Sequence, residues 1–510
     1  MANREELGII RGARTGDRHS QLALGKLYLF GSAGLPKSLP TALHWLQRAA
    51  QQNCAESCLL IGEHIPYDVA QHGPAAELAL SYERAYDAGV AQAGLVLAQL
   101  TLARGDGGGA LRPKALRGLE AAARAGLADA QWLLVQHGGA APSAPDGKAW
   151  LARAADNGVS AALYAMLGQA WDEGEREQFL RRALPVARLL AQDAGEGADG
   201  AKRPAGAALT AQEVLLLSRC AQIVGAGDLA HDVDAAQLSR FYELAAEGGD
   251  RSAQLALGLW FARMDVRGAR TQASAGVVNF KRAIRWLTQA GEQGLAEAWF
   301  ALSRIYTKPE FSQRSVAEAQ SYLERAADMG HGAAQLECGI HAWRTRRDGE
   351  NHDVRAAYWL MKAAAQGSAE AEAALEKIAP GAEAALWRGA IAPLQALELA
   401  ASQPLLAARL ELAGIFDLSR PEALLLDLNT ADAGHCLVID IRASYGRSKR
   451  RLALVRTAAQ RQALDRIVRL FERLDCGLGG PEGNYRQRLY RLKTYLPELM
   501  PDAAGALLPA

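Results

Sequence analysis

One segment of the chain occurs twice with almost the same sequence, and it sets the architecture. Residues 16–25 read GDRHSQLALG, and residues 249–258 read GDRSAQLALG. When the first Gly of each segment is taken as an anchor, equivalent positions recur between and after the two, most of them 36 or 37 residues apart. These further anchors are Asn53, Gly89, Gly126, Gly158, Gly294, Gly330 and Gly367. A period of this length is typical of a protein built from stacked helical repeats.

Small and aromatic residues recur at fixed distances from the anchors. Nine positions after most anchors lies a small residue: Gly25, Gly62, Ala98, Gly258, Ser303 or Gly339. Eight positions before most anchors lies an aromatic residue: Trp45, Trp150, Phe241, Trp286, Tyr322 or Trp359. We interpret the anchor as a left-handed helix stop. Gly inside a helix costs about 1 kcal/mol relative to Ala. A small residue that recurs there despite this cost predicts that two helices come into close contact at that position.

The recurring motif also has a family resemblance. Ala-x-x-Trp-Leu-x-x-Ala-Ala, then Gly, then Ala-x-x-x-Leu-Gly resembles the Sel-one-like repeat, a relative of the tetratricopeptide repeat, with good instances at 42–62, 283–303 and 356–374. The resemblance covers most of residues 1–380. It implies an all-α fold, a right-handed α/α solenoid of helix–turn–helix repeats whose concave surface binds partners. Ser81 and Gly118 depart from the pattern, because each stands where the aromatic residue belongs.

The spacing of the anchors suggests how the chain is divided. The anchors at 158 and 249 are 91 residues apart, and the text between them includes a segment rich in Gly, Ala and charged residues. We interpret this segment as a flexible loop or hinge. The predicted division is N-terminal repeats at 1–190, the loop at 191–208, C-terminal repeats at 209–380 and an appendage at 381–510.

Several further patterns bear on compartment and chemistry. The N-terminal residues are charged, no window approaches 18 consecutive apolar residues, and the six Cys are scattered, so we expect a cytoplasmic protein without a membrane segment. The Gly pattern at 195, 197 and 200 is interpreted as linker, because no strand precedes it. Cys54, Cys58 and the polar group at 228–234 are interpreted as ordinary repeat and loop residues rather than metal ligands. No catalytic motif is complete, and we expect no cofactor.

From about residue 381 the repeat stops and a small α/β appendage is predicted. Residues 436–441 and 451–455 have the pattern of two short strands around a turn at Gly446, and two helices follow. Residues 442–493 contain 14 Lys and Arg but only 4 Asp and Glu, a net charge of +10, whereas the rest of the chain carries −9. The formal net charge of +1 is therefore the sum of a strongly basic segment and an acidic remainder.

Nine basic residues of this segment are candidates for binding. They are Arg447, Lys449, Arg450 and Arg451 on the predicted hairpin, Arg466, Arg469 and Arg473 on one face of the first helix, and Arg486 and Arg488 on the second. Each has the chemistry to contact a phosphate of DNA or RNA. The alternative is a basic face that docks on protein, including the acidic repeats of the same chain.

A second resemblance is confined to about 405–475. The strand pair, Lys449 and the following helix are similar to the first half of the catalytic domain of tyrosine recombinases (phage integrases), in which a hairpin carries a catalytic Lys. When Glu422 is aligned with the family's Glu, Ser419 stands where the catalytic Arg belongs, and Arg420 lies one position late. No His-x-x-Arg motif follows. The resemblance implies a degenerate half-domain that retains DNA binding without strand transfer.

Together these patterns predict a scaffold or adaptor that is not an enzyme and that binds a protein partner through the concave surface of its repeats. The alternative function is an adaptor whose segment 442–493 binds nucleic acid.

Overall fold

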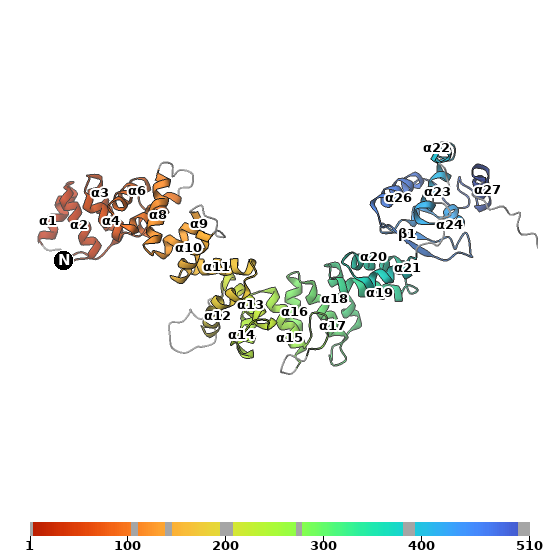
Figure 1. Cartoon of the computed structure of the whole chain (residues 1–510), viewed down its shortest axis with the longest axis horizontal. Helices are drawn as coiled ribbons and strands as arrows, with labels where there is room; N and C mark the ends of the chain where they lie inside the picture. Colours follow the sequence, from red (N-terminus) through yellow and green to blue (C-terminus); the bar gives the residue numbers. More distant parts are fainter. Residues whose placement is uncertain are drawn as a thin grey trace, which may run out of the picture. The chain divides into compact units, whose positions relative to one another are not determined.

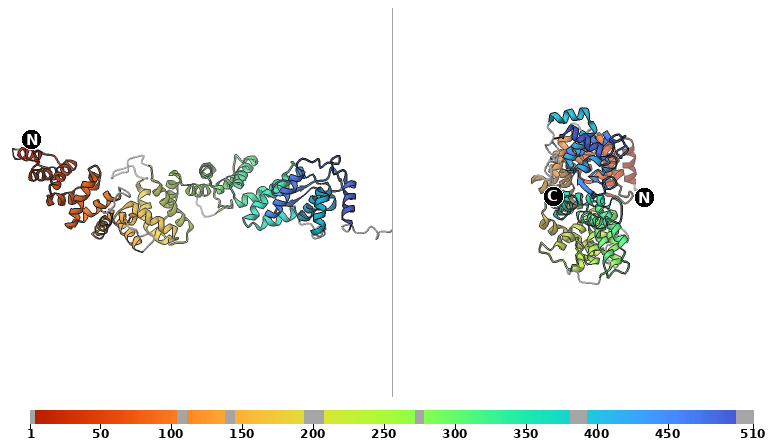
Figure 2. Two further views of the ribbon diagram at one scale, coloured as in Figure 1. Left: turned by 90° about the horizontal axis from the view of Figure 1, so that it is seen from above. Right: turned by 90° about the vertical axis from the view of Figure 1, so that its right-hand side faces the viewer.

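The computed structural model describes residues 4–103, 111–137, 145–193, 208–271, 278–380 and 393–497 (Figure 1). These residues form a predominantly helical protein with one two-stranded sheet, as predicted. The chain divides into two compact units, Met1–Phe241 and Tyr242–Ala510, which are described separately. Figure 2 shows the same elements from two further directions.

The first unit consists of helices that pack mainly against their neighbours in the chain. They are α1 (Arg4–Arg14), α2 (Arg18–Phe30), α3 (Leu39–Gln51), α4 (Ala55–His64), α5 (Tyr67–Ala70), α6 (Ala75–Asp87), α7 (Ala91–Leu102), α8 (Arg112–Arg124), α9 (Ala128–His137), α10 (Pro145–Asp156), α11 (Ser160–Asp172), α12 (Arg176–Asp193) and α13 (Ala211–Ala226). The boundary between the units falls within α14 (Ala235–Glu247).

The second unit contains further repeats and then the appendage. The repeat helices are α15 (Arg251–Ala262), α16 (Phe280–Glu292), α17 (Ala296–Thr307), α18 (Val316–Asp328), α19 (Gly332–Arg344), α20 (His352–Ala365) and α21 (Ala369–Ile378). The appendage contains α22 (Pro393–Ser402), α23 (Pro404–Phe416), α24 (Arg420–Leu425), α25 (Leu428–Ala431), β1 (Cys436–Ile439), β2 (Arg451–Leu454), α26 (Ala458–Phe471) and α27 (Tyr485–Tyr495).

The predicted anchors end helices as expected. All nine have a positive φ, from 59° at Asn53 to 98° at Gly16 and Gly330. At the first of them the Gly16 amide donates to the carbonyl of Ala13 and the next amide, that of Asp17, donates to the carbonyl of Gly12. This pair of bonds defines a Schellman C-cap, which needs a left-handed residue. Two more such stops, Gly174 and Gly227, lie in the long gap where the period gave no anchor.

The predicted close contact at the small residues is confirmed. A Cβ added to Gly25, Gly258 or Gly339 would lie 2.5–2.6 Å from the leucine side chain that it faces, which is Leu46, Leu287 and Leu360 respectively. In each unit this leucine directly follows the aromatic residue. The small residue therefore lets two helices approach until backbone touches side chain.

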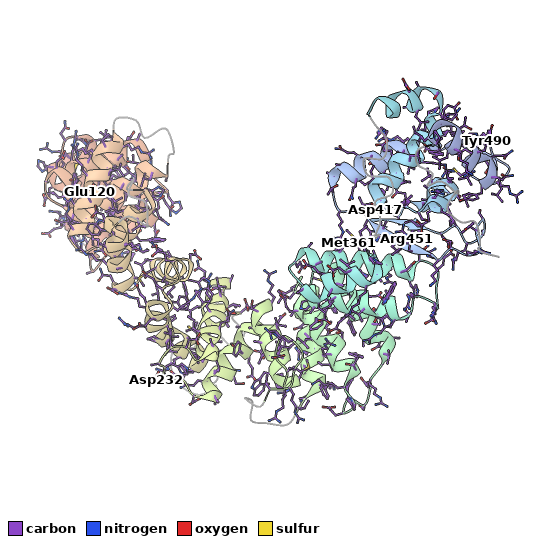
Figure 3. All side chains as sticks on the ribbon, turned by 45° about the vertical axis from the view of Figure 1, so that its right-hand side comes forward. Glu120, Asp232, Met361, Asp417, Arg451 and Tyr490 are labelled. Carbon is purple, nitrogen blue, oxygen red and sulfur yellow. The ribbon has the colours of Figure 1, made fainter. Side chains whose placement is uncertain are left out.

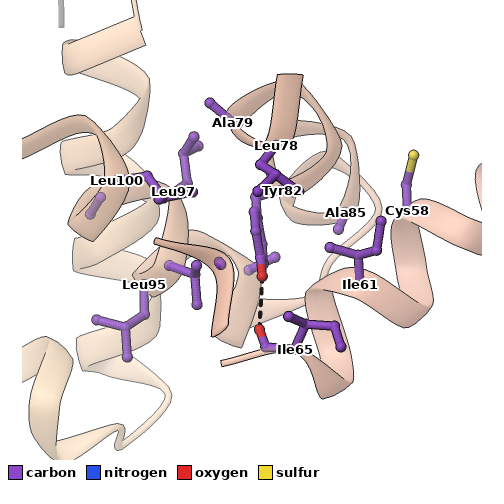
Figure 4. Packing of buried hydrophobic residues seen from close by; sticks show 14 of the residues in the cluster. Cys58, Ile61, Ile65, Leu78, Ala79, Tyr82, Ala85, Leu95, Leu97 and Leu100 are labelled. Carbon is purple, nitrogen blue, oxygen red and sulfur yellow. Dashed lines mark hydrogen bonds between the residues drawn. The ribbon is translucent and has the colours of Figure 1, made fainter. Parts of the chain in front are cut away.

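The two departures from the repeat pattern have local explanations. At Gly118, α7 and α8 approach so closely that a Cβ on Gly94 would lie 2.6 Å from the Gly118 carbonyl oxygen. At Ser81, the next residue replaces the usual leucine: Tyr82 is fully buried, and its hydroxyl donates to the Ile65 carbonyl over 2.8 Å (Figure 4). Burial raises the pKa of this phenol, so the hydroxyl remains a hydrogen-bond donor.

The appendage has its own core around a β-hairpin. Strands β1 and β2 pair antiparallel, with Cys436 opposite Leu454 and Ile439 opposite Arg451, which confirms the predicted strand pair. Helices α22 and α23 are separate, because Pro404 has no amide hydrogen and begins a new helix. The core includes Leu410, Leu424, Ile439, Leu464 and Phe471.

The predicted domain division stays a prediction. Helix α12 continues to Asp193, so the first residues of the predicted loop at 191–208 are helical. Residues 194–207, including the Gly pattern at 195, 197 and 200, lie outside the described residues.

Candidate functional site

Arg450, one of the nine predicted binding residues, ties the appendage to the last repeat. Its guanidinium Nε and Nη2 donate to the two carboxylate oxygens of Asp353 over 2.7 and 2.9 Å, and Nη2 also donates to Asn351 Oδ1. Burial works to raise the pKa of Asp353, but the hydrogen bonds and charge of Arg450 outweigh it and hold that pKa below its ordinary value. In the strand that follows Arg450, Leu452 and Leu454 pack in one cluster with residues of α20.

Arg451, beside it in the hairpin, holds the hairpin to α24 of the same appendage. Its Nε and Nη2 donate to the carboxylate oxygens of Glu422 over 2.9 and 2.7 Å, and Nη2 also donates to the Asp417 carbonyl. Burial alone would raise the pKa of Glu422; the bonds from Arg451 and the Ser419 amide lower it overall. Arg450 therefore has a structural partner in the last repeat, and Arg451 has one within the appendage.

Arg488 is part of a buried cluster that holds α27 in place. It is 2% exposed, and its guanidinium donates to the carbonyls of Leu424, Cys476, Gly477 and Gly483. Next to it, Arg409, which is 1% exposed, donates from Nε and Nη2 to the two oxygens of buried Glu482 over 2.7 and 2.5 Å. Burial lowers the pKa of Arg488 from its ordinary value. The interior position of Arg488 assigns it a structural role.

The other six predicted residues lie at the surface. Arg466 is exposed and forms an ion pair with Glu411. Among the described residues, the side chains of the remaining five are exposed and form neither a hydrogen bond nor an ion pair: Arg447, Lys449, Arg469, Arg473 and Arg486. The structure thus separates three cations bound internally and one with a surface partner from five that are available to a ligand.

The residues aligned with the recombinase motif have local roles. Ser419 is the N-cap of α24, in a capping box with Glu422, and Arg420 is the first residue of that helix. Lys449 is exposed in the loop before β2. The resemblance to recombinases stays a prediction.

A groove lies on the repeats of the second unit, between the end of α14, α15 and α16. Its volume is about 360 Å³, and its lining combines an aromatic ring with charged and amide side chains. The lining residues are Ala246, Glu247, Gln254, Arg285, Trp286, Gln289, Glu292 and Gln293. The guanidinium of exposed Arg285 lies over the Trp286 ring, 5.0 Å from its centroid. Arg48 over Trp45 and Arg153 over Trp150 repeat this pairing in the first unit.

A pair of hydrogen-bonded amides lines this groove. Gln254 donates from Nε2 to the Ala246 carbonyl over 3.1 Å and accepts at Oε1 from Gln293 Nε2 over 2.8 Å. The same pair recurs between other successive repeats. The members are Gln21 with Gln52, Gln131 with Asn157, and Gln335 with Gln366. Each pair joins a buried amide of one repeat to an exposed amide of the next.

The sequence analysis did not find these pairs, although a signal for them is present. The buried Gln always lies five residues after an anchor, and its partner lies directly before the following anchor. In two units another residue stands at the position of the buried Gln, Cys58 in one and Trp299 in the other. The position of its partner is then apolar, Ala88 and Met329 respectively. Trp299 still donates from its indole nitrogen to the carbonyl eight residues earlier, as the Gln residues do. The two positions thus change together from unit to unit of one chain.

The remaining polar groups singled out in the sequence have ordinary surroundings. Asp232, in the group at 228–234, pairs with Arg188 over 2.6 Å, and the hydrogen bond lowers the pKa of its carboxyl group. Burial raises the pKa of Cys220, Cys338 and Cys436 to about 12, which disfavours the reactive thiolate. None of the helices in the described part of the chain has both the length and the apolar character needed to cross a bilayer.

The left-handed stops, the close helix contacts and the recurring amide pairs define an all-α helical-repeat protein with a small appendage. The Sel1 repeat, the Sel-one-like unit expected from the sequence, matches at residues 18–54, 119–159, 274–295, 296–331 and 349–368. The chain therefore carries Sel1 repeats.

Solved structures are also similar to the chain. One is a protective antigen present in uropathogenic Escherichia coli strains, described as displaying an SLR fold; it is 19% identical, with a TM-score of 0.47 and 100% of both chains covered. Another is a Sel1 repeat protein from Oxalobacter formigenes, 20% identical, with a TM-score of 0.34, covering 65% of this chain and 89% of that one. No curated protein matches the chain.

Proposed function

We propose that this protein is a cytoplasmic scaffold or adaptor that binds a protein partner through the concave surface of its repeats. Sel1 repeats generally mediate protein–protein interaction. The observation that carries the proposal is the groove over α14–α16, where Trp286, Arg285 and Gln293 offer an aromatic ring, a charge and an amide to one ligand. Such a mixture of a buried aromatic residue and a polar rim suits a polypeptide. The six unpaired cysteines support the cytoplasmic location.

The lining of the groove also suggests which chemistry the partner presents. The acidic side chains of Glu247 and Glu292 flank the single cation, Arg285, and both are exposed. The amides of Gln289 and Gln293 can donate to and accept from a peptide backbone. We therefore favour a polar peptide segment with a basic residue as the occupant.

The experiment is affinity purification of the full chain and of two charge-reversal variants, with and without nuclease. Glu292→Lys changes the groove, whereas Glu376→Lys makes the same charge change at an exposed position of α21 that does not line the groove. The proposal expects a partner that survives nuclease, is kept by Glu376→Lys and is lost or weakened by Glu292→Lys, because the added cation repels the basic residue of the partner. A set of partners that Glu292→Lys leaves unchanged would count against this groove.

A further inference from the structure

Helix α27 presents two different faces. Its inner face is held by buried Arg488 and Leu492, whereas Arg486, Tyr490 and Lys493 lie four and three residues apart and are all exposed. Spacings of three and four place them on one side of a helix. Tyr490 is 71% exposed, more than any other described aromatic residue among the exposed large hydrophobic side chains. An aromatic ring between two cations is thus left open to solvent.

The loop before β2 adds to this surface. The rings of Tyr445 in the loop and Tyr485 at the start of α27 lie 5.9 Å apart, so the loop and the helix are neighbours. Arg447 and Lys449 follow Tyr445 and have no partner among the described residues. We call Arg447, Lys449, Arg486, Tyr490 and Lys493 the basic face.

Acidic residues are missing from the elements of the basic face. Neither the loop 442–449 nor α27 contains Asp or Glu. Among the described residues, the carboxylates nearest to them in sequence are already engaged: Asp440 by Arg442, and buried Glu482 by Arg409. The charge of the basic face is therefore not compensated within these elements, and a polyanion would gain contacts without displacing an ion pair.

The second group of free cations, at the C-terminal end of α26, differs in this respect. Arg469 shares α26 with Asp465 and with Arg466, which is paired with Glu411. Arg473 was expected on the same helical face but lies two residues beyond the end of α26, next to exposed Glu472. No aromatic residue stands exposed between these arginines. The basic face is the better polyanion site, and α26 offers a matched comparison in the same appendage.

We propose that the basic face binds single-stranded nucleic acid, with Arg447, Lys449, Arg486 and Lys493 at the phosphates and a base stacked on Tyr490. Single-strand binding proteins combine these two components, a cationic surface along the backbone and exposed aromatic rings for the bases. An acidic protein would use the cations alone, so the open ring of Tyr490 favours nucleic acid. This site is separate from the groove in the repeats and does not depend on the proposed scaffold function.

The test is fluorescence anisotropy of the full chain with labelled single-stranded DNA and RNA of about 12 nucleotides. We expect binding at low salt, and Tyr490→Ala weakens it by roughly tenfold, whereas Tyr490→Phe retains it because the ring is kept. Arg486→Ser with Lys493→Ser lowers the affinity and reduces the slope of log affinity against log salt by about 1.4. The matched control, Arg469→Ser with Arg473→Ser, removes the same charge and has a smaller effect.

Three results would overturn the proposal. The first is an absence of binding to either oligonucleotide at low salt. The second is an equal loss in the α26 control, which would show a diffuse charge effect. The third is an unchanged affinity in Tyr490→Ala together with equally tight binding of polyglutamate, which would assign the face to an acidic protein. Because all the substituted side chains are exposed, we expect the variants to fold, and circular dichroism checks this.

Discussion

In the repeats the recurring buried polar side chains are neutral amides, whereas the interior of the appendage holds arginines around a carboxylate. Gln254 and its equivalents are each satisfied by a backbone carbonyl and by an amide of the next repeat. Arg409, Arg488 and Glu482 satisfy one another and several carbonyls at the base of α27. Both arrangements give buried polar atoms hydrogen-bond partners, the repeats with neutral amides and the appendage with charged groups.

The difference explains how freely each region varies. Both members of an amide pair are neutral, so replacing them leaves no unpaired charge in the interior. The unit with Cys58 and Ala88 has other residues at both positions. A buried ion pair has no such neutral intermediate, because removal of one partner leaves the other charge unpaired. Repeats therefore tolerate variation between units, while the appendage depends on a specific set of residues. Figure 3 labels two residues of the appendage, Arg451 and Tyr490.

The largest effect is expected from breaking the buried ion pair. Glu482→Gln leaves Arg409 and Arg488 as two buried cations without their shared carboxylate, and we expect a loss of about 3–5 kcal/mol in the local stability of the appendage. Hydrogen exchange of the α23 and α27 amides measures it. In the control, Arg466→Met removes a surface ion pair and should cost less than about 1 kcal/mol. Similar losses of stability in the two variants would show that the buried ion pair matters no more than a surface one.

The next effect concerns backbone contact in the repeats. Gly94→Ala places a methyl group 2.6 Å from the Gly118 carbonyl oxygen, where no side chain can move aside, and should destabilise the first unit by about 1–3 kcal/mol. Gly168→Ala, in α11, meets nothing within 4 Å and should stabilise it by up to about 1 kcal/mol. Chemical denaturation of the full chain gives both values. A gain in stability for both variants would show that α7 and α8 separate easily.

A smaller effect is expected from the amide pairs. Gln335→Cys removes the side-chain donor of the Ala327 carbonyl, which keeps the Gly330 amide, and it removes one acceptor of Gln366; we expect a cost of about 0.5–1.5 kcal/mol. The double variant Gln335→Cys with Gln366→Ala copies the Cys58 and Ala88 unit, so its cost should be less than the sum of the two single changes. A double-mutant cycle by denaturation checks this. Strict additivity would mean that the two positions change together for another reason.

The smallest effect is a pH dependence of the contact between the appendage and the last repeat. The pKa of Asp353 is lowered in the folded protein, so its contact with Arg450 contributes stability above the ordinary Asp pKa of about 4 and loses it as pH falls through the lowered value. Hydrogen exchange of β1 and β2 during acid titration should show weakening below about pH 4. In Asp353→Asn this step should disappear; a persistent step would assign it to another carboxylate.

Much of the fold could be predicted because it repeats. Left-handed stops, close contacts at Gly25 and Gly258 and the antiparallel hairpin all depend on local sequence or on a periodic pattern, and each agrees with the structure. The stops at Gly174 and Gly227 were not found, since the units around them have lost the aromatic marker. The roles of Arg450 and Arg451 could not be found either, because their carboxylate partners are 97 and 29 residues away in the chain. Arg488 has nearer partners too, but one of its acceptors, Leu424, is 64 residues away.

The sequence by itself determined the repeat unit, its helix stops and the concentration of positive charge after residue 442. These properties arise from backbone preferences, helical periodicity and composition, which act over a few residues. Only the tertiary structure decided which cations are free, because that depends on where distant carboxylates and carbonyls lie. It divided nine similar basic residues into a docking residue, a hairpin support, a buried anchor, a surface ion pair and five exposed groups. Three of these five, Arg447, Lys449 and Arg486, belong to the basic face with the open ring of Tyr490.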